Sequence, residues 1–489
     1  VRSGGSQFAR VLTHNTVFAA SLPAPRTPPA GPRRLFPPRM AHLARRLLLA
    51  CALVSARTAA SSTFDAPPRA FCDVVSDFGA VGDNHTEDTA AVASALKACS
   101  TVLIPGGHTF LLRPVEIPSH RHLVIDGTVA AWRDIWSWPN SSHKLCTTSP
   151  YRTPTPKIET APQLEALLWG EGVSNVTVSG NGTIDGQGWR WWSLPANKSD
   201  GEYWHHCRPY LLAFGRGDVR QPGAISDVAV SGITLKDPPF WTVTGRGLRR
   251  ARFSRVKVDT ASGCGFSEAP NTDGFNLQGE DILVEDSSVR NGDDCVPLFP
   301  PTRNVLVRNL SCECGNPPAP AVWPYHSQPG TDDGDIVDVT FDRVSLRNTS
   351  SGLAMKSLPG LVGRAHNISY TNFELRDVGL GMAINFFRQG RRRAEERSRH
   401  TPLDSLDPAL GAWASSVLIE NVTGTVTMGA GHINCLGLQP CTDLRLVGVQ
   451  LSMAGSGAPA APYTCENATG TYADCSPAPC GWSTSRGAM

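Results

Sequence analysis

Short runs of alternating apolar and polar residues recur along most of the chain. Each run is rich in β-branched residues and ends at one or two turn residues, after which a second short run follows. Copies of this pattern begin at Asn175 (NVTVSGNGTIDG), Asp227, Ala251, Asp281 (DILVEDSSVRN), Asn304, Ile336, His366, Ser416 and Asp443. Alternation with a period of two is typical of strands that bury one face. Most steps are about 23 to 33 residues, and two longer steps leave room for an unrecognised copy or an insertion.

A repeat of this length, built from short strands without a helical pattern, predicts a β-solenoid. One coil cannot bury its own inward face, so coils must stack, which buries a continuous column of Val, Ile and Leu and pairs the strands in parallel. We therefore predict an all-β fold, a right-handed parallel β-helix. A β-propeller is the alternative for this period, and the absence of a four-strand blade pattern disfavours it.

The segment Thr89–Cys99 (TAAVASALKAC) differs, because its Ala, Val and Leu residues recur at helical spacing. The acidic residues Glu87 and Asp88 precede it and suit a helix N-terminus. We expect a short N-terminal capping helix that covers the open end of the solenoid and protects its edge strands.

The first 60 residues are set apart from the predicted solenoid. Residues 1–39 are rich in Pro and Arg without periodicity, and we interpret them as a disordered or upstream segment. Residues 40–60 have the pattern of a secretory signal: two arginines, a short apolar run and small residues for cleavage. The apolar run is far shorter than the ~20 residues of a membrane span, and its alternative interpretation is a buried core segment. We therefore expect a secreted protein whose residues 64–485 form one catalytic domain, with no membrane association after signal removal.

Sequons and cysteines agree with secretion. Asn-x-Ser/Thr sequons occur at Asn84, Asn140, Asn175, Asn181, Asn197, Asn309, Asn348, Asn367, Asn421 and Asn467. Of the 14 cysteines, Cys51 lies in the predicted signal, so 14 − 1 = 13 remain and at least one is unpaired or pairs between chains. Cys312 and Cys314 lack a second pair at metal-site spacing, so we predict no metal. The net charge of +2 gives no reason to expect a nucleic-acid partner.

Two acidic motifs stand about one solenoid period apart. Asp273 lies in NTDG, and Asp293 and Asp294 lie in GDDC, 20 and 21 residues later. In a stacked coil this spacing puts them on neighbouring coils, about 4.8 Å apart along the axis. Crowded carboxylates raise at least one pKa, and a protonated acid beside an ionised base is what glycosidic-bond hydrolysis requires. The alternatives are ordinary turn residues and a calcium site.

These motifs, together with three others, give the chain a family resemblance. The others are DFGAVGD at 77–83, GNGTIDGQGWRWW at 180–192 and RPYLLAF at 208–214. From about Phe71 to Cys480 the chain resembles glycoside hydrolase family 28, the polygalacturonase family. The resemblance implies an inverting mechanism without metal or organic cofactor. Asp293 would be the general acid, and Asp273 and Asp294 would activate water. Inversion typically separates the carboxyl groups by about 6.5–9.5 Å, which leaves room for that water.

The chain departs from the family pattern at the residues expected to bind substrate. No GHG follows GDDC; Asn316 or Pro318 falls nearest the family's His, and His326 is either its replacement or a surface residue. The family's RIK is Ala354-Met355-Lys356 here, which keeps the lysine and loses a planar carboxylate binder. Where the family commonly has Tyr, this chain has Asn385-Phe386-Phe387. We predict that Lys356, Asn271 and His326 bind substrate.

Several smaller features have two interpretations. Cys295 is expected to pair with Cys312 or Cys314, and the other of these two is a candidate for the odd thiol. The acidic cluster Asp332, Asp333 and Asp335 is a solvated turn or a calcium site. Four tryptophans either stack on sugar rings or form an internal aromatic ladder: Trp189, Trp191, Trp192 and Trp241.

We predict an inverting glycoside hydrolase that cleaves α-1,4-galacturonosyl linkages in polygalacturonate or a related pectic polysaccharide. Its partner is this acidic polysaccharide, and we expect the enzyme to be a monomer. The changed binding residues put unsubstituted polygalacturonate in doubt as the preferred substrate. Alternatives are a hydrolase of rhamnogalacturonan or xylogalacturonan, and a catalytically weak glycan-binding β-helix. A lyase would need a base and usually calcium, and Lys356 is the one obvious base.

Overall fold

The computed structural model describes residues 68–145, 162–193, 207–215, 225–260, 267–322, 335–357, 363–386, 412–436 and 439–484. Every described residue lies in the unit Asp65–Met489. The predictions for residues 1–39, residues 40–60 and His326 therefore concern residues outside the described ranges. The predicted boundaries of the catalytic domain, 64–485, stay a prediction.

Strands dominate the described residues. The N-terminal strands are β1 (Arg69–Asp73), β2 (Asp83–Glu87), β3 (Cys99–Ile104), β4 (Thr109–Leu112), β5 (Val115–Glu116), β6 (Arg121–Ile125), β7 (Thr128–Ala131), β8 (Asn140–Leu145), β9 (Pro162–Leu164), β10 (Leu168–Gly170), β11 (Ser174–Ser179) and β12 (Thr183–Asp185). The middle strands are β13 (Leu212–Phe214), β14 (Ile225–Ser231), β15 (Thr234–Lys236), β16 (Val243–Ser254), β17 (Lys257–Asp259), β18 (Phe275–Asp294), β19 (Pro297–Asn316), β20 (Ala319–Val322), β21 (Ile336–Arg347) and β22 (Ser351–Ser357). The last strands are β23 (Gly363–Asn385), β24 (Ala412–Asn434), β25 (Cys441–Met453), β26 (Thr464–Glu466), β27 (Ala468–Ala473) and β28 (Ser483–Thr484).

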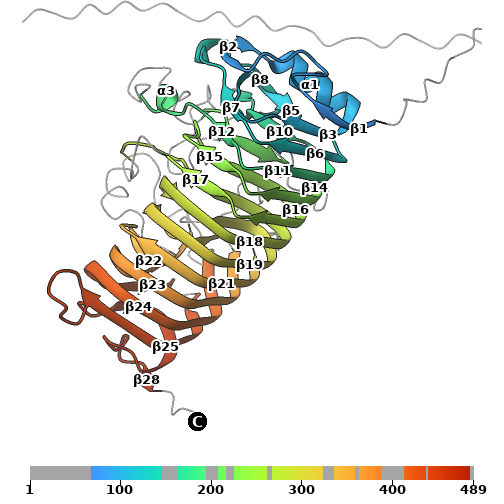
Figure 1. Cartoon of the computed structure of the whole chain (residues 1–489). Helices are drawn as coiled ribbons and strands as arrows, with labels where there is room; N and C mark the ends of the chain where they lie inside the picture. The colour runs from blue at the N-terminus through green and yellow to red at the C-terminus, as the bar shows by residue number, and fades with distance from the viewer. Residues whose placement is uncertain are drawn as a thin grey trace, which may run out of the picture. The chain divides into compact units, whose positions relative to one another are not determined.

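These strands stack coil on coil in chain order, from β1 to β28 (Figure 1). All pairings within the 26-stranded sheet are parallel, and the antiparallel pair is β8 with β9. The fold is therefore the predicted all-β parallel solenoid, a β-helix. Among the described residues, no helix has the length and apolarity needed to cross a membrane.

One column of paired residues shows how the repeat builds the core. Each partner in the column is the inward apolar residue of one predicted copy, and all of them are buried. In register the column runs Val176, Val228, Ala251, Ile282, Val305, Val339, Ile368, Val417 and Leu444. Val176 pairs directly with Val228, and Ile368 directly with Val417. The two long steps in the sequence are therefore insertions within a coil rather than unrecognised coils.

The residue directly before each inward residue of this column occupies a left-handed backbone position. Asp281 has φ 58°, Asn304 has φ 55° and Asn367 has φ 55°. Asn and Asp tolerate this conformation better than other non-glycine residues, because their short polar side chains bond locally. Asn304 Nδ2 donates to Asp281 Oδ1 at 2.7 Å on the preceding coil, and Asn367 Nδ2 donates to Asp338 Oδ1 at 2.8 Å. The polar turns thus stack in the same register as the core.

The predicted helix forms as α1 (Thr89–Ala98), packed against β1, β3 and β5 through the buried residues Val92, Ala95 and Leu96. Its N-terminus lies directly after Glu87 and Asp88, as expected. Asp88 holds the N-cap position but makes no side-chain cap, because its carboxylate accepts the backbone N–H groups of Val81 and Gly82 at 2.7 and 3.0 Å. Among the described residues, the other helical segments are the short α3 (Trp189–Trp192) and the 3₁₀ turn η1 (Ile135–Ser137).

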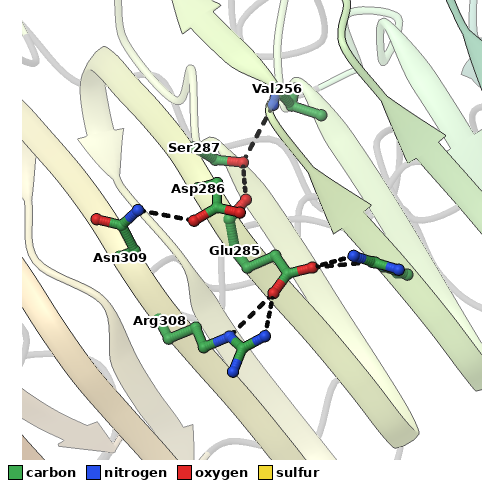
Figure 2. Close-up of polar contacts among 7 residues, drawn as sticks. Val256, Glu285, Asp286, Ser287, Arg308 and Asn309 are labelled. Atoms are coloured by element: carbon green, nitrogen blue, oxygen red, sulfur yellow. Dashed lines mark hydrogen bonds and ion pairs between the residues drawn. The ribbon is translucent and has the colours of Figure 1, made fainter.

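A buried carboxylate ties three consecutive coils together on the face shown in Figure 2. Glu285 on β18 has a side chain only 3% exposed. Arg308 on β19 donates Nε and Nη2 to Oε2 at 2.9 and 2.6 Å. Arg252 on β16 donates Nε and Nη2 to Oε1 at 2.9 and 2.5 Å. Two-pronged arginine contacts of this kind are among the strongest hydrogen bonds in proteins. Figure 2 also shows Ser287 accepting from the backbone of Val256 beside this cluster.

The cysteines are mostly paired. The disulfides that join two described cysteines include Cys72–Cys99, Cys295–Cys312, Cys435–Cys441 and Cys465–Cys480. Cys295 thus takes one of its two expected partners. The expectation that the other is the odd thiol is wrong, because Cys314 is also disulfide-bonded. Among the described cysteines the free thiol is Cys475, half-buried near the end of the solenoid.

Candidate active site

Strand β18 places the three aspartates together by winding once around the solenoid. Asp273 lies two residues before its start, and Asp293 and Asp294 are its last two residues. The backbone N–H of Gly274 donates to the carbonyl of Asp294 at 2.8 Å, so the two motifs lie side by side on adjacent coils, as their spacing predicts. One carboxylate oxygen from each of the three residues lies within 4.8 Å of the other two. The separation of about 6.5–9.5 Å between the carboxyl groups of an inverting pair stays a prediction for this site.

Contacts of the neighbouring residues explain which residue types the motifs NTDG and GDDC require. Thr272 Oγ1 accepts the N–H of Gly292 at 2.9 Å, and Asn291 Nδ2 donates to the carbonyls of Thr272 and Asp294, both at 2.9 Å. A Cβ at position 274 would lie 2.5 Å from the carbonyl oxygen of Cys295, so only glycine fits between the coils. These contacts fix the backbone that carries the aspartates.

Lys356 and Asn316 hold the carboxylates from the following coils. Lys356 on β22 donates Nζ to Asp294 Oδ1 at 2.5 Å and also contacts Oδ2. Asn316, the last residue of β19, donates Nδ2 to Asp293 Oδ1 and to Asp294 Oδ1, both at 3.0 Å. Ser350 Oγ donates to Asn316 Oδ1 at 2.6 Å, which fixes the orientation of the amide. Of the two positions considered for the family's His, the structure places Asn316 at the aspartates.

Arg208 supports the other side of Asp293 through Asn271. Asn271 Nδ2 donates to Asp293 Oδ2 at 3.2 Å, and Arg208 Nη2 donates to Asn271 Oδ1 at 3.1 Å. Arg208 is 1% exposed and its Nη1 donates to the carbonyls of Pro239 and Pro270. Burial lowers the pKa of its guanidinium, against the attraction of Asp273 and Asp293. Since an arginine ordinarily titrates above about pH 12, it stays cationic at neutral pH.

The electrostatics of the cluster favour one protonated acid. Burial raises the pKa of Asp293 to about 7, and the negative charge of Asp294 adds to the shift. Burial also raises the pKa of Asp273 well above its usual range, with further contributions from Asp293 and Asp294. Burial alone lowers the pKa of Lys356, but the attraction of Asp294, Asp293 and Asp273 outweighs it and raises that pKa. Three carboxylates beside one ammonium group therefore share protons as a unit, and Asp293 is the least buried of the three.

Three acidic side chains within reach of one another are also a possible cation site. The N–H donors around these side chains argue against a cation site. Lys356 covers both oxygens of Asp294, and the amides of Asn316 and Asn271 donate to the two oxygens of Asp293. Lone pairs engaged by N–H groups suit an acid–base cluster better than a calcium or magnesium site, whose ligands are free oxygens.

The remaining sequence candidates are dispersed. His326, Asp332 and Asp333 lie outside the described residues, while Asp335 accepts Nη2 of Arg364 at 2.7 Å. Ala354 is 8% exposed, and Phe386 is buried in the core. Trp191 is buried edge-on against Trp138, and Trp241 is buried in a stack with Tyr210, with ring centroids 5.2 Å apart. Trp189 is 49% exposed, with the guanidinium of Arg190 over its ring.

Sequence reasoning missed Arg208 and Ser350 as supports of the site. It left open whether Asn316 reaches the aspartates, and so did not foresee that Asn316 bridges Asp293 and Asp294. Arg208 stood in a quoted motif without a role, and it lies 63 residues before Asn271. Ser350 carries no motif at all. Only the placement of NTDG and GDDC on adjacent coils could have pointed to residues on the coils to either side.

The sequence pattern that defines glycosyl hydrolases family 28 matches residues 98–477, more than half of the chain. The chain belongs to this family. A probable polygalacturonase of Arabidopsis thaliana is 24% identical over 396 residues, which cover 77% of this chain and 77% of the relative. An exopolygalacturonase of Cochliobolus carbonum is 24% identical over 412 residues, covering 78% and 82%. Membership of family 28 makes the protein a polygalacturonase-like glycoside hydrolase.

Solved structures of two other hydrolases share the fold. The exopolygalacturonase of Thermotoga maritima aligns with a TM-score of 0.63 at 17% identity, over 83% of this chain and 91% of that one. The endo-xylogalacturonan hydrolase of Aspergillus tubingensis aligns with a TM-score of 0.56 at 18% identity, over 85% and 100%. At these identities the likeness establishes the β-helix and nothing further.

Proposed function

We propose that this family 28 enzyme hydrolyses α-1,4-galacturonosyl linkages in a pectic polysaccharide. The observation that carries the proposal is the partly buried Asp293, whose pKa of about 7 leaves it largely protonated in mildly acidic solution beside the ionic pair of Asp294 and Lys356. A protonated carboxylic acid next to a carboxylate is the pair of groups that glycoside hydrolysis uses. The names of the similar plant and fungal proteins, polygalacturonases, support galacturonan as the polymer.

In this mechanism Asp293 protonates the oxygen that leaves. Asp294, with its negative charge held by Lys356, accepts a proton from the attacking water, and Asp273 completes the acidic wall around that water. Asn316 and Asn271 orient Asp293 by donating to its two oxygens. The raised pKa of Asp273 makes Asp294 the stronger candidate for the base.

Inversion of the anomeric centre rests on family membership. Proton NMR of the first product formed tests this step directly. Inversion yields the β-anomer from an α-linkage, and initial formation of the α-anomer would contradict it.

A second candidate substrate is xylogalacturonan. It is favoured by Ala354, which stands next to Met355 and Lys356 where a carboxylate-binding arginine is expected and which leaves more room above β22. Measuring reducing-end release from polygalacturonate, xylogalacturonan and rhamnogalacturonan distinguishes the candidates. The proposal requires measurable hydrolysis of one of them, with the highest kcat/KM on a galacturonan backbone. Binding of all three without release of sugar ends would contradict it in favour of a glycan-binding protein.

We also propose that the enzyme acts as a secreted monomer whose coil is right-handed, with α1 as the cap. Four disulfides among the described residues support an oxidising compartment. Parallel strands joined by crossovers are right-handed in about 98% of cases, which supports the handedness. Intact mass and light scattering of the protein recovered from a secreting host test the processing and the monomer.

A further inference from the structure

A groove of about 560 Å³ lies along one bend of the solenoid, and none of the three aspartates lines it. One wall is a column of left-handed turn residues from successive coils, with φ between 50° and 60°: Arg255, Asp286, Asn309, Arg343 and Asn372. The other wall is the row of outward residues two positions later, which pair in register from coil to coil: Lys257, Ser288, Ser311, Ser345 and Glu374. Leu310 and Val344, between the two walls, are buried. A groove of this size can bury a ligand of several ring units.

The groove offers hydrogen-bonding groups that the protein itself does not use. In the part of the chain that the structure describes, the side-chain hydroxyls of Ser288, Ser311 and Ser345 make no hydrogen bond. The guanidinium of the exposed Arg255 has no ion pair or hydrogen bond with a described residue either. Side chains stacked on adjacent coils recur about every 4.8 Å, and each hydroxyl can both donate and accept. Such a row suits a ligand that carries many hydroxyl groups.

The charges of the groove are balanced. Three ion pairs neutralise three of its charged side chains: Lys257 with Asp259, Arg343 with Asp342, and Glu374 with Arg376. The two remaining charges, those of Arg255 and Asp286, have opposite signs. A strongly acidic polymer therefore gains little electrostatic attraction here, since it needs a surface of the opposite charge. A neutral carbohydrate binds through its hydroxyl groups and fits the groove better.

The sequence itself supplies an attachment point for carbohydrate in this groove. Asn309, Leu310 and Ser311 form a sequon, whose asparagine lies in one wall and whose serine lies in the other. Asn309 is exposed, and its Nδ2 donates to Asp286 Oδ1 at 2.7 Å (Figure 2). N-glycosylation replaces one of the two hydrogens on Nδ2, so the other N–H can keep this bond. The folded coil is therefore compatible with a glycan on Asn309.

We propose that Asn309 is N-glycosylated and that the first sugar units of its glycan lie in this groove, bonded to the row of serines. The donor is an oligosaccharide carried on a lipid pyrophosphate, which reacts with the chain before the coil closes. Nδ2 of Asn309 bonds to C1 of the first sugar and loses a proton to solvent. The bond from C1 to the pyrophosphate oxygen breaks, and its electron pair leaves with the lipid pyrophosphate. The inference rests on the proposed secretion, which brings the chain to this donor, and is independent of the proposed reaction.

The glycan is mapped by peptide mass spectrometry on the full chain recovered from a eukaryotic secreting host. The peptide that contains Asn309 should carry a glycan. Ser311→Ala removes the sequon but keeps Asn309 and its bond to Asp286, so this glycan alone should disappear. Ser311→Thr retains the sequon and should retain the glycan. Neither change should alter the rate of polymer hydrolysis, because none of the aspartates lines the groove.

Thermal unfolding tests whether the glycan lies in the groove. Ser311→Ala should lower Tm by about 2 °C in the glycosylated protein, and should leave Tm unchanged in protein made without N-glycans in the bacterial periplasm. Ser369→Ala is the matched control. It removes the sequon of Asn367, an exposed asparagine in the same left-handed conformation that also bonds to the preceding coil and lies outside the groove. This control should leave Tm unchanged in both preparations.

Two mapping results separate this inference from the proposed secretion. A secreted, processed chain with glycans at other sequons and a bare Asn309 would overturn the inference and leave secretion intact. A chain that keeps residues 40–60 and carries no glycan would overturn both. A glycan on Asn309 whose loss leaves Tm unchanged would overturn its place in the groove, as would an equal loss of Tm for Ser311→Ala in the unglycosylated protein.

Discussion

The side-chain amide of Asn316 donates a hydrogen bond of 3.0 Å to Oδ1 of Asp293. A hydrogen bond donated to a carboxylate favours its ionised form, so this amide lowers the pKa of Asp293 against the stronger effect of burial. The amide does not titrate. Its effect on the pKa of Asp293 is therefore the same at every pH, unlike the effect of the neighbouring carboxylate of Asp294.

Replacing Asn316 by Ala should shift the pH dependence of hydrolysis. Without the amide, the pKa of Asp293 rises above about 7, so the acid stays protonated to higher pH. We expect the alkaline limb of kcat/KM to move upward by about one pH unit, which corresponds to about 1.4 kcal/mol. A pH–rate profile measures the shift. Asn309→Ala, at an exposed asparagine on the same strand, should leave the profile in place, and a downward shift for Asn316→Ala would contradict the assignment.

Replacing Lys356 by Met should reduce kcat without unfolding the enzyme. The change removes the cation beside Asp294 and raises the pKa of Asp293 and Asp273, since Lys356 lowers both. The cluster then holds more protons and lacks an ionised base, which we expect to cost about 10²–10⁴ in kcat. Initial rates under saturating substrate measure it. Lys356→Arg keeps the charge, and if it lost as much activity as Lys356→Met, geometry rather than charge would be the cause.

Replacing Glu285 by Gln should destabilise the fold and leave the chemistry unchanged. The carboxylate joins two arginines on adjacent coils, and we expect a loss of about 2 kcal/mol in the free energy of unfolding, less than for a fully buried pair because both arginines are partly exposed. Urea denaturation measures it. Glu374→Gln, at an exposed residue paired with Arg376, is the control and should change stability little.

The same carboxylate gives stability a pH dependence. The arginine contacts lower the pKa of Glu285 in the folded protein, led by the bond from Arg308. Its contribution is therefore complete above the unfolded pKa of about 4.3 and is lost as the pH falls through the folded pKa. The stability difference between wild type and Glu285→Gln should shrink below pH 4. A constant difference at lower pH would show that packing, not charge, stabilises the wild type.

The β-helix follows from the sequence because two independent patterns agree. Alternation places Val228 and Ile282 inward, and Asp227 and Asp281, one residue earlier, occupy the left-handed turn in front of each strand. The same agreement places Asp273 beside Asp294. Local sequence therefore predicts the register wherever each copy starts on a turn residue.

The supporting residues could not be predicted in this way. Asn316 and Ser350 contact each other across 34 residues, and which residue of the 312–330 stretch reaches Asp293 depends on where β19 ends. The close approach of the carboxyl groups depends on side-chain rotamers within two adjacent coils.

The most direct test of the central claim is hydrolysis by Asp293→Asn. Its side chain keeps the size and the hydrogen-bonding shape of the acid and cannot deliver the proton. Asp281→Asn, at an exposed turn on the same strand, is the matched control. We predict that Asp293→Asn lowers reducing-end release from the preferred polymer by at least about 10³-fold, with an unchanged Tm and with full activity in Asp281→Asn. Release by Asp293→Asn within a few-fold of the wild type would contradict the account, because the leaving oxygen would then be protonated by another group.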